Sequence, residues 1–490
     1  MIEINQNAKN FFKNWLDELP DFINRIEIKN LCFDSREVKP GDVFVAMPSV
    51  ARNEPQYIKA ALENGATLIL AEKNYTDEMV GSSLIIPRLP EWIGEVLHEV
   101  LGRACEKMNA IGITGTNGKS SISFYLAQLL NELNKPCAVM GTLGYGDWQA
   151  LTETGMTTLP VDKLHKVLAE LSEQHRAIAI EVSSHGLKQG RLAGVQFQAA
   201  IYSNLSRDHL DYHGTMEAYG AAKARLFQWP SLQFAIINSD DEFSEELIKQ
   251  TSCERIICYG QSQSADLKFK ITEIHNNGMT VRFTWLGQEQ SMELPLYGEF
   301  NAYNVAASLA CVLQMGFDFN ESVLALSKIK PVPGRMQQIK SNKHKPLVLV
   351  DYAHTPDALQ QALLAVKRHC LGKIHLVVGC GGDRDQGKRA LMGAIALKCA
   401  DRIVFTSDNP RTEAASKICL DMTVGLNPER YSVELDRNKA IVNSVLEAAE
   451  NDLVLIAGKG HENYQEINGQ RFYFSDELVA QEALLLGNKA

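Results

Sequence analysis

A glycine-rich segment that carries a lysine and two serines is the clearest chemical feature of the sequence. Residues 111–121 read I-G-I-T-G-T-N-G-K-S-S and join an apolar, strand-like run to a segment with helical character. Backbone N–H groups at the start of a helix, together with a lysine, can bind phosphate oxygens. The strict G-x-x-x-x-G-K-[ST] pattern has glycine where this chain has Ile113, so the match is a variant. It predicts an ATP site, with a turn that binds no ligand as the alternative.

Within this loop the residues have distinct expected roles. Lys119 would lie against the β- and γ-phosphates, and Ser120 would supply a hydroxyl to Mg²⁺. The residues expected to contact the nucleotide are Gly115, Thr116, Asn117, Gly118, Lys119, Ser120 and Ser121.

Two candidate metal ligands follow neighbouring strand-like runs. Glu181 ends the run AIAIEV, and His209 follows AAIYSNL in the segment S-R-D-H-L-D-Y-H-G. Adjacent parallel strands end at one edge of a sheet, so both side chains could come near the nucleotide. Mg²⁺ prefers oxygen ligands, and chemistry alone therefore leaves a core or surface role open for His209.

Lys223 is a third candidate. It lies in Y-G-A-A-K-A-R-L-F, where Tyr219, Lys223 and Phe227 fall on one helical face at i, i+4 spacing. A solvated helix lysine explains the same pattern. A buried lysine, however, loses its proton more readily, and only the neutral amine can react with CO₂.

The elements that must hold these residues fall into blocks. A chain of 490 residues with 45% hydrophobic and 22% charged residues can form about three domains of roughly 150 residues each. The first block, residues 1–95, has strand-like and helical stretches at 43–47 and 57–66, which predict a small α/β domain. Helical spacing of apolar residues over 89–101 predicts a helix leading into the second block.

The second block, residues 96–332, alternates apolar runs with helical stretches. The runs are AIGIT, CAVMGTL, AIAIEV, AAIYSNL, FAIIN and RIICYG. This alternation is typical of a largely parallel sheet covered by helices. After Asp266 the pattern changes to alternating strands, and Asn276-Asn277-Gly278 predicts a hairpin turn. A small antiparallel sheet is therefore expected beside the parallel one.

The third block, residues 333–490, repeats one theme. LVLVDYAH, IHLVVGCGGDRD, RIVFTSDNPR and LVLIAGKGHE are each a buried-type strand followed by Gly, Asp or Arg. Open parallel sheets bind ligands at the carboxyl ends of their strands. We therefore predict a Rossmann-like domain whose four polar clusters line one edge of its sheet.

Charge and composition exclude several classes of function. The formal net charge of -10 disfavours binding to nucleic acid. The ten cysteines form no C-x-x-C pair, which suits reduced thiols better than a disulfide framework or a zinc site. The N-terminus lacks a basic start followed by an apolar stretch, and no run of about 18 apolar residues occurs. We expect a cytoplasmic monomer without membrane insertion.

The motif T-G-T-N-G-K-[ST] resembles the ATP loop of the Mur ligases and of the related folylpolyglutamate synthetases. The resemblance extends through at least six motifs, in the expected order, over nearly the whole chain. It implies that Glu181 and His209 are metal ligands, and that Lys223 carries CO₂ as a carbamate (N6-carboxylysine) able to hold a second Mg²⁺. It further implies nucleotide contacts from Asn301 and Asn304 in G-E-F-N-A-Y-N, although helix capping by asparagine is an alternative. Arg335 and Asp351 match positions that reach the nucleotide from the third domain.

Other matching positions imply how an acceptor is bound. Residues that resemble those holding a muramoyl peptide are Thr157, Thr158, Ser183, Gln189 and Arg191. The segment around Phe33 and Ser35 resembles the UDP-binding domain of family members that add the third residue. Where a His-Gln-Ala-like loop is expected, this chain has Val50-Ala51-Arg52, so UDP contacts there are in question.

The segment Asp408-Asn409-Pro410-Arg411 resembles the motif of members that add diaminopimelate, although D-N-P also forms turns readily. Arg389, Gly458 and Glu462 match further positions of that site. An arginine suits a carboxylate bidentately, and Glu462 suits the distal ammonium.

The resemblance therefore implies an ATP-dependent ligase with a catalytic set of Lys119, Glu181, His209 and Lys223. Its substrates would be UDP-N-acetylmuramoyl-L-Ala-D-Glu and meso-diaminopimelate, joined through an acyl phosphate. Three alternatives stay open at this point. They are folylpolyglutamate synthesis, a P-loop NTPase that moves a partner, and a nucleotide-sensing protein without chemistry.

Overall fold

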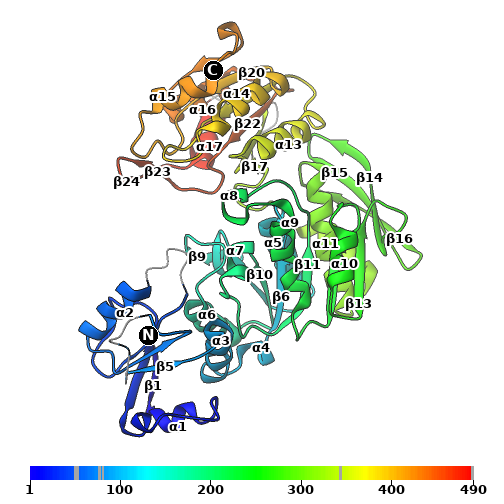
Figure 1. Cartoon of the computed structure of the whole chain (residues 1–490). Coiled ribbons are helices and arrows are strands. Elements are labelled where there is room, and N and C mark those ends of the chain that lie inside the picture. Colours follow the sequence, from blue (N-terminus) through cyan, green and yellow to red (C-terminus); the bar gives the residue numbers. More distant parts are fainter. Residues whose placement is uncertain (49–53, 76–78, 80–81, 341–344, 487–490) are drawn as a thin grey trace. The chain divides into compact units, whose positions relative to one another are not determined.

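The computed structural model describes residues 1–48, 54–75, 79, 82–340 and 345–486 (Figure 1). The chain forms two compact units. The first comprises Met1–Lys119, Asn134–Ile237 and Asp241–Ile256, and the second comprises Ser120–Leu133, Asn238–Asp240 and Ile257–Ala490.

The N-terminal part of the first unit is a five-stranded sheet in the order β1-β2-β3-β4-β5, antiparallel between β1 and β2 and parallel elsewhere. Its elements are β1 (Ile2–Asn7), α1 (Ala8–Phe12), the 3-10 helix η1 (Asp21–Arg25), β2 (Glu27–Cys32), β3 (Val43–Val45), α2 (Glu54–Glu63), β4 (Leu68–Ala71), β5 (Ser83–Ile85), α3 (Leu89–Val100) and α4 (Ala104–Lys107). Leu89, Ile93, Val96 and Leu97 of α3 are buried in the same core as the strands. The helix predicted over 89–101 is therefore confirmed.

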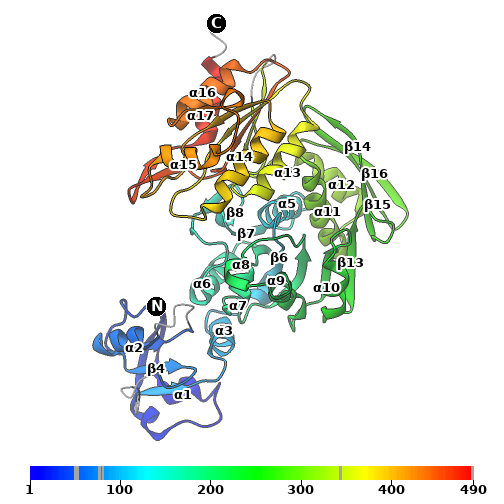
Figure 2. The same cartoon turned by 45° about the horizontal axis from the view of Figure 1, so that its top comes forward.

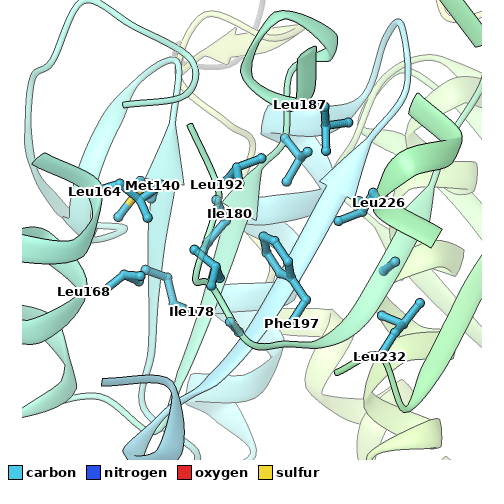
Figure 3. Packing of buried hydrophobic residues seen from close by; sticks show 14 of the residues in the cluster. Met140, Leu164, Leu168, Ile178, Ile180, Leu187, Leu192, Phe197, Leu226 and Leu232 are labelled. Atoms are coloured by element: carbon cyan, nitrogen blue, oxygen red, sulfur yellow. The ribbon is translucent and has the colours of Figure 1, made fainter. Parts of the chain in front are cut away.

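The rest of the first unit is built on a sheet in the order β12-β11-β6-β10-β7-β8-β9, parallel from β12 to β7. Its elements are β6 (Asn109–Thr114), β7 (Cys137–Gly141), β8 (Gly144–Asp147), β9 (Ala150–Thr152), α6 (Val161–Ser172), β10 (Ala177–Glu181), α7 (Ser184–Lys188), β11 (Phe197–Tyr202), α8 (Leu210–His213), α9 (Met216–Ala224), the 3-10 helix η3 (Arg225–Gln228), β12 (Phe234–Asn238) and α10 (Ser244–Gln250). Figure 3 shows its core, in which Ile178, Ile180 and Phe197 of the sheet pack with Leu164 and Leu168 of α6.

The register of this sheet places the predicted site residues. In β10 Glu181 pairs with Ile113 of β6, and in β11 Tyr202 pairs with Thr114 of β6. The glycine-rich loop therefore leaves β6 between the ends of two parallel neighbours, as expected for a ligand site at a sheet edge.

The second unit contains helices and an antiparallel sheet. Helix α5 (Lys119–Glu132) and strand β13 (Arg255–Gly260) each begin in the first unit and end in the second. The following elements are β14 (Leu267–His275), β15 (Gly278–Trp285), β16 (Gln288–Leu294), α11 (Glu299–Gln314), α12 (Phe319–Ala325) and the 3-10 helix η4 (Leu326–Lys328). His275 pairs with Gly278 across the predicted Asn276-Asn277-Gly278 turn, and β14, β15 and β16 are antiparallel. Both the hairpin and the small antiparallel sheet are confirmed.

The C-terminal part of the second unit is a sheet in the order β17-β18-β22-β19-β20-β21, parallel except for the edge strand β17. Its elements are β17 (Gln337–Ile339), β18 (Leu347–Asp351), α13 (Pro356–Lys367), β19 (Ile374–Val378), α14 (Gly387–Cys399), β20 (Arg402–Phe405), α15 (Ala415–Thr423), the 3-10 helix η5 (Pro428–Arg430), β21 (Ser432–Val433), α16 (Arg437–Glu447), β22 (Leu453–Ala457), β23 (Tyr464–Ile467), β24 (Gln470–Tyr473) and α17 (Asp476–Leu486).

Helices cover both faces of this sheet, because alternate residues of its strands are buried in two different clusters. Leu349 and Leu455 pack with α13, α14 and α15, whereas Val350 and Ile456 pack with α16 and α17 (Figure 2). The register also aligns Asp351, Ala457, Val378 and Phe405 at the carboxyl ends of four parallel strands. The prediction that four strand ends form one edge is therefore confirmed.

The fold class predicted from the sequence is confirmed: the chain is α/β, with largely parallel sheets and one small antiparallel sheet. All ten cysteines are free thiols. Within the described ranges, no helix combines the length and apolar character that crossing a membrane requires.

Candidate functional site

The loop predicted to bind phosphate follows β6 and is held by the two residues after β11. Gly115 and Gly118 have φ angles of 149° and 87°, which glycine adopts freely. A Cβ atom at Gly115 would collide with Ser203 Oγ. Asn204 Oδ1 accepts a hydrogen bond from Asn117 N at 3.0 Å, and Ser203 Oγ donates to Asn117 O at 2.5 Å. These contacts fix the loop backbone, whose N–H groups are the predicted phosphate ligands.

Two lysine side chains meet at the carbonyl of Gly115. Lys119 Nζ donates to Gly115 O and Thr116 O, each at 2.8 Å, and Lys223 Nζ donates to Gly115 O at 2.8 Å. Lys223 is 1% exposed and lies 4.3 Å from the centroid of the Tyr219 ring. Burial lowers the pKa of Lys223 well below its ordinary value, and the charge of Lys119 lowers it further. The explanation of Lys223 as a solvated helix lysine is therefore wrong.

Glu181 is a buried carboxylate with a fixed orientation. It is 1% exposed at the end of β10, and its two oxygens accept hydrogen bonds from Thr142 N and Thr142 Oγ1, each at 3.1 Å. A Cβ atom at Gly141 would collide with the Glu181 side chain. Because the Thr142 hydroxyl gives its one proton to Glu181, Thr157 Oγ1 must donate to Thr142 Oγ1 across their 3.0 Å contact.

His209 lies among other aromatic side chains at the start of α8. Its φ angle is 52°, and its Nε2 atom is 3.5 Å from Asp208 Oδ2. The His209 ring packs edge-on against His185, with centroids 4.9 Å apart, and its side chain is 48% exposed. A fully buried core role for His209 is therefore excluded.

The part of the chain that the structure describes has no group of three or more His, Cys, Asp or Glu side chains able to hold a metal ion. The predicted set of metal ligands is not such a group, because it includes the Ser120 hydroxyl and a modified Lys223 besides Glu181 and His209. A hydroxyl, a carboxylate and a carbamate are oxygen donors, the type that Mg²⁺ prefers.

The predicted acceptor residues form one hydrogen-bonded group in the first unit. Thr158 Oγ1 donates to Glu181 O at 3.0 Å and lies 3.0 Å from Ser183 Oγ. Arg191 donates to Thr158 O and to Gln189 Oε1, each at 2.8 Å. Thr158 thus bonds directly to the backbone of Glu181, and Thr157 reaches the Glu181 carboxylate through the Thr142 hydroxyl. The structure therefore brings together Thr157, Thr158, Ser183, Gln189 and Arg191.

Four of the residues predicted to bind the nucleotide lie on α5 and α11 of the second unit. Ser120 and Ser121 are each 6% exposed in the first turn of α5. Asn301 Nδ2 donates to Tyr297 O at 2.8 Å, and its Oδ1 accepts from Tyr125 OH at 3.1 Å and Asn304 Nδ2 at 3.2 Å. The N-cap of α11 is Gly298, with no side-chain cap. The alternative role of Asn301 and Asn304 as helix caps is therefore wrong.

Arg335 and Asp351 lie together in the second unit. Asp351 ends β18 and accepts hydrogen bonds from Met336 N at 2.7 Å and Ala353 N at 2.8 Å. Burial raises the pKa of the Asp351 carboxyl, and the Arg335 charge opposes that rise. The Arg335 guanidinium lies 4.4 Å from the centroid of the Tyr352 ring. The side chain of Arg335 therefore stacks beside the strand end that carries Asp351.

The D-N-P-R segment follows β20 and meets the segment that follows β22. Asn409 Nδ2 donates to Glu462 Oε2 at 2.7 Å, and Asn409 Oδ1 accepts from Lys459 Nζ at 3.0 Å. Gly458 has a φ angle of 116°, which favours glycine, and a Cβ atom there would lie 2.6 Å from Asp408 Oδ2. The structure thus brings together four of the predicted site residues, Asp408, Asn409, Gly458 and Glu462.

The two predicted arginines have different environments. Arg411, with Pro410 before it in the chain, donates to Gly382 O at 2.7 Å, and its Nε lies 3.3 Å from a carboxylate oxygen of Glu466. Arg389 is fully buried, and its guanidinium bonds to Glu413 at 2.7 and 2.9 Å and to Asp421 at 2.8 Å. In this arrangement Arg389 contacts protein carboxylates beside the loop that holds Arg411.

The N-terminal candidates lie at the end of β2. Ser35 is 7% exposed, and its carbonyl accepts a hydrogen bond from Asn64 Nδ2 at 2.9 Å, while Phe33 is half-buried. The neighbouring Arg36 lowers the pKa of Asp34 to about 2. The segment Val50-Ala51-Arg52 lies outside the described residues.

Sequence reasoning missed several residues that hold the predicted ones in place. They are Thr142, Ser203, Asn204, Lys459 and Glu466. Most of them have a recognisable position in the sequence. Thr142, Ser203 and Asn204 come directly after strands, and Lys459 lies within G-K-G-H-E. Polar residues at strand ends were therefore the signal that could have found them.

The sequence is similar to proteins of one known family over most of its length. Two family models match: the Mur ligase middle domain over residues 113–312, and the Mur ligase glutamate ligase domain over residues 334–460. The UDP-N-acetylmuramoyl-L-alanyl-D-glutamate–2,6-diaminopimelate ligase of Chromobacterium violaceum is 42% identical over 496 residues, covering 97% of this chain and 99% of that protein.

Solved structures show the same likeness. One described as a UDP-N-acetylmuramoyl-L-alanyl-D-glutamate–2,6-diaminopimelate ligase has a TM-score of 0.74 at 38% identity, covering 99% of this chain and 100% of that chain. A Mycobacterium tuberculosis folylpolyglutamate synthase complexed with ADP and AMPPCP has a TM-score of 0.60 at 19% identity, covering 80% and 94%. The second match is a likeness of fold alone.

Proposed function

The chain belongs to the Mur ligase family, and from this premise we propose that it adds meso-2,6-diaminopimelate to UDP-N-acetylmuramoyl-L-Ala-D-Glu. The reaction uses ATP and forms an amide at the D-glutamate carboxyl group, in peptidoglycan precursor synthesis. Similarity over almost the full length to a relative with that name carries the proposal. The phosphate loop supports the use of ATP in this proposal, because the side chains of Lys119 and Lys223 meet there at the carbonyl of Gly115.

The proposed reaction has two steps. A carboxylate oxygen of D-glutamate attacks the γ-phosphorus of ATP, and the bond from that phosphorus to the β-bridging oxygen breaks, which gives an acyl phosphate and ADP. An amine of diaminopimelate then attacks the acyl carbon, and inorganic phosphate leaves as the amine loses a proton. Such transfers depend mainly on positioning and on neutralising charge. Lys119 and the loop N–H groups position the phosphates and neutralise part of their negative charge.

Bound Mg²⁺ would offset the negative charge of the phosphates. Ser120, Glu181, His209 and carbamylated Lys223 would hold it, and the oxygen donors among them suit the ion. The carbamate forms when the neutral Lys223 amine adds to CO₂ and a proton is released. The burial that lowers the pKa of Lys223 favours that neutral amine.

We assign the substrates to three parts of the chain. Residues 1–95, with Phe33 and Ser35, bind the UDP part, and residues 96–332 bind ATP and the muramoyl dipeptide. Residues 333–490 bind diaminopimelate. The residues assigned to the amino acid are Arg389, Asp408, Asn409, Pro410, Arg411, Gly458 and Glu462, and those assigned to the adenosine side are Asn301, Asn304, Arg335 and Asp351. We further propose that the reaction takes place in the cytoplasm and is carried out by a monomer.

A phosphate-release assay tests the proposed function. The purified protein receives ATP, Mg²⁺ and UDP-N-acetylmuramoyl-L-Ala-D-Glu, with diaminopimelate, lysine or no amino acid. We expect steady phosphate release only with both the UDP substrate and diaminopimelate. Equal turnover with lysine would contradict the specificity. Release without any amino acid would instead point to an NTPase, and turnover with a folate and glutamate to folylpolyglutamate synthesis.

A further inference from the structure

A fully buried lysine stands at the centre of the group formed by the D-N-P-R and G-K-G-H-E segments. The Lys459 side chain has no exposed surface, and it follows β22 by two residues. Its Nζ atom donates to Asn409 Oδ1 at 3.0 Å and to Glu462 Oε2 at 3.1 Å. A buried ammonium group is costly unless it is paired and hydrogen-bonded, and here both conditions are met.

Lys459 determines which way the Asn409 amide faces. Asn409 Oδ1 accepts from both Lys459 Nζ and Glu466 N, the latter at 2.9 Å. An ammonium group is only a donor, so the amide oxygen must face it. The Asn409 NH₂ group is then directed at Glu462 Oε2, to which it donates at 2.7 Å.

The same contacts fix the Glu462 carboxylate. Both side-chain hydrogen bonds to Glu462, from Asn409 and Lys459, fall on Oε2. Among the described residues, Oε1 is therefore the oxygen left to accept a bond from an incoming ammonium group. The Glu462 side chain is 19% exposed, whereas that of Lys459 is not exposed at all. Glu462 can therefore reach a ligand, and Lys459 can act only through its neighbours.

We propose that Lys459 is a positioning residue for the amino-acid substrate. It holds the Asn409 amide and the Glu462 carboxylate in one arrangement, so that Glu462 Oε1 binds the ammonium group at the distal end of diaminopimelate. This inference rests on the proposed function, because it assigns the amino-acid site of that reaction. It adds a residue that does not touch the substrate but determines how well the substrate binds.

A role limited to folding makes a different prediction. Removing one partner of a buried ion pair destabilises a protein strongly, whatever that pair does for a ligand. A folding role lowers stability and the amount of active enzyme but leaves the KM of the remaining enzyme for each substrate unchanged. A positioning role raises the KM for diaminopimelate alone.

The test begins with wild-type enzyme, whose phosphate release must depend on diaminopimelate. If it does not, the proposed function fails and the inference loses its premise. The variant is Lys459→Met, which keeps most of the side-chain volume and removes the ammonium group. The matched control is Lys398→Met, the same change at an exposed position of α14. The KM values for diaminopimelate, ATP and the UDP substrate are measured for each, with thermal unfolding as a record of folding.

We expect Lys459→Met to raise the KM for diaminopimelate at least tenfold, with the other two KM values within twofold of wild type. Its preference for diaminopimelate over lysine should fall as well. Lys398→Met should match wild type in all of these. Lys459→Gln keeps a neutral hydrogen-bond donor, so it should show a smaller shift in the same direction and gives the test if Lys459→Met does not fold. A folded Lys459 variant with an unchanged KM for diaminopimelate would overturn the inference.

Discussion

Replacement of Thr142 by valine isolates the hydroxyl that orients Glu181. Valine nearly matches threonine in shape and keeps the backbone N–H, which would still donate to Glu181 Oε1 across 3.1 Å. The substitution removes the bond from Thr142 Oγ1 to Glu181 Oε2, also 3.1 Å long, together with the bond that Thr142 Oγ1 accepts from Thr157. A hydrogen bond to a charged group contributes about 1.5–3 kcal/mol. If that energy is lost from the transition state, kcat should fall roughly ten- to 150-fold.

The assay is phosphate release at saturating ATP, UDP substrate and diaminopimelate, with excess Mg²⁺. Thr142→Ser is the matched control, because it keeps the hydroxyl and removes only a methyl group. We expect Thr142→Ser to stay within about threefold of wild type, on the order of 0.6 kcal/mol. If kcat for Thr142→Val also stayed within that range while the protein remained folded, the reasoning about Glu181 would be refuted.

Lys119, Lys223 and His165 can each be tested by substitution. Lys119→Ala should lower kcat by roughly 10²–10³, the usual loss for one electrostatic donor at a transition state, and wild-type turnover at saturating substrate would disprove its role. Lys223→Ala should abolish turnover, and wild-type enzyme depleted of CO₂ should lose activity that bicarbonate restores; mass spectrometry showing no added carboxylate on active enzyme would exclude the carbamate. His165 of α6 is 2% exposed, and its Nε2 atom lies 2.7 Å from Ala193 O. Burial lowers the pKa of His165 to about 4, so its stabilising contribution is complete above the ordinary histidine pKa of about 6.5 and is lost as pH falls toward 4. Denaturant unfolding from pH 7.5 to 4.5 should therefore show a smaller loss of stability for His165→Gln than for wild type, by up to about 3 kcal/mol, and equal losses would contradict this assignment.

Local sequence patterns predicted much of the fold because they depend on neighbouring residues. The loop from Gly115 to Ser120 lies between a strand and a helix as expected, and the turn before Gly278 joins two antiparallel strands. The four strand ends of the third block align because consecutive buried runs of this kind form parallel sheets.

Contacts between distant segments could not be predicted in this way. Thr142 and Glu181 are 39 residues apart, and Asn409 and Lys459 are 50 residues apart. Each pair meets because its two strands end at one edge of a sheet. The order of strands in a sheet cannot be predicted from a local sequence pattern. Arg389 shows the same limit, since nothing near it in the sequence reveals that Glu413 and Asp421 surround its guanidinium.

We propose that a substrate carboxylate is phosphorylated at the loop that Lys119 and Lys223 share. An isotope experiment tests it directly, using UDP-N-acetylmuramoyl-L-Ala-D-Glu with ¹⁸O in the D-glutamate side-chain carboxyl group. Attack of that carboxylate on the γ-phosphorus transfers one labelled oxygen to the phosphate released when diaminopimelate is added. We predict labelled inorganic phosphate by ³¹P NMR, in step with product formation. Unlabelled phosphate from a reaction that still forms the amide would contradict the claim.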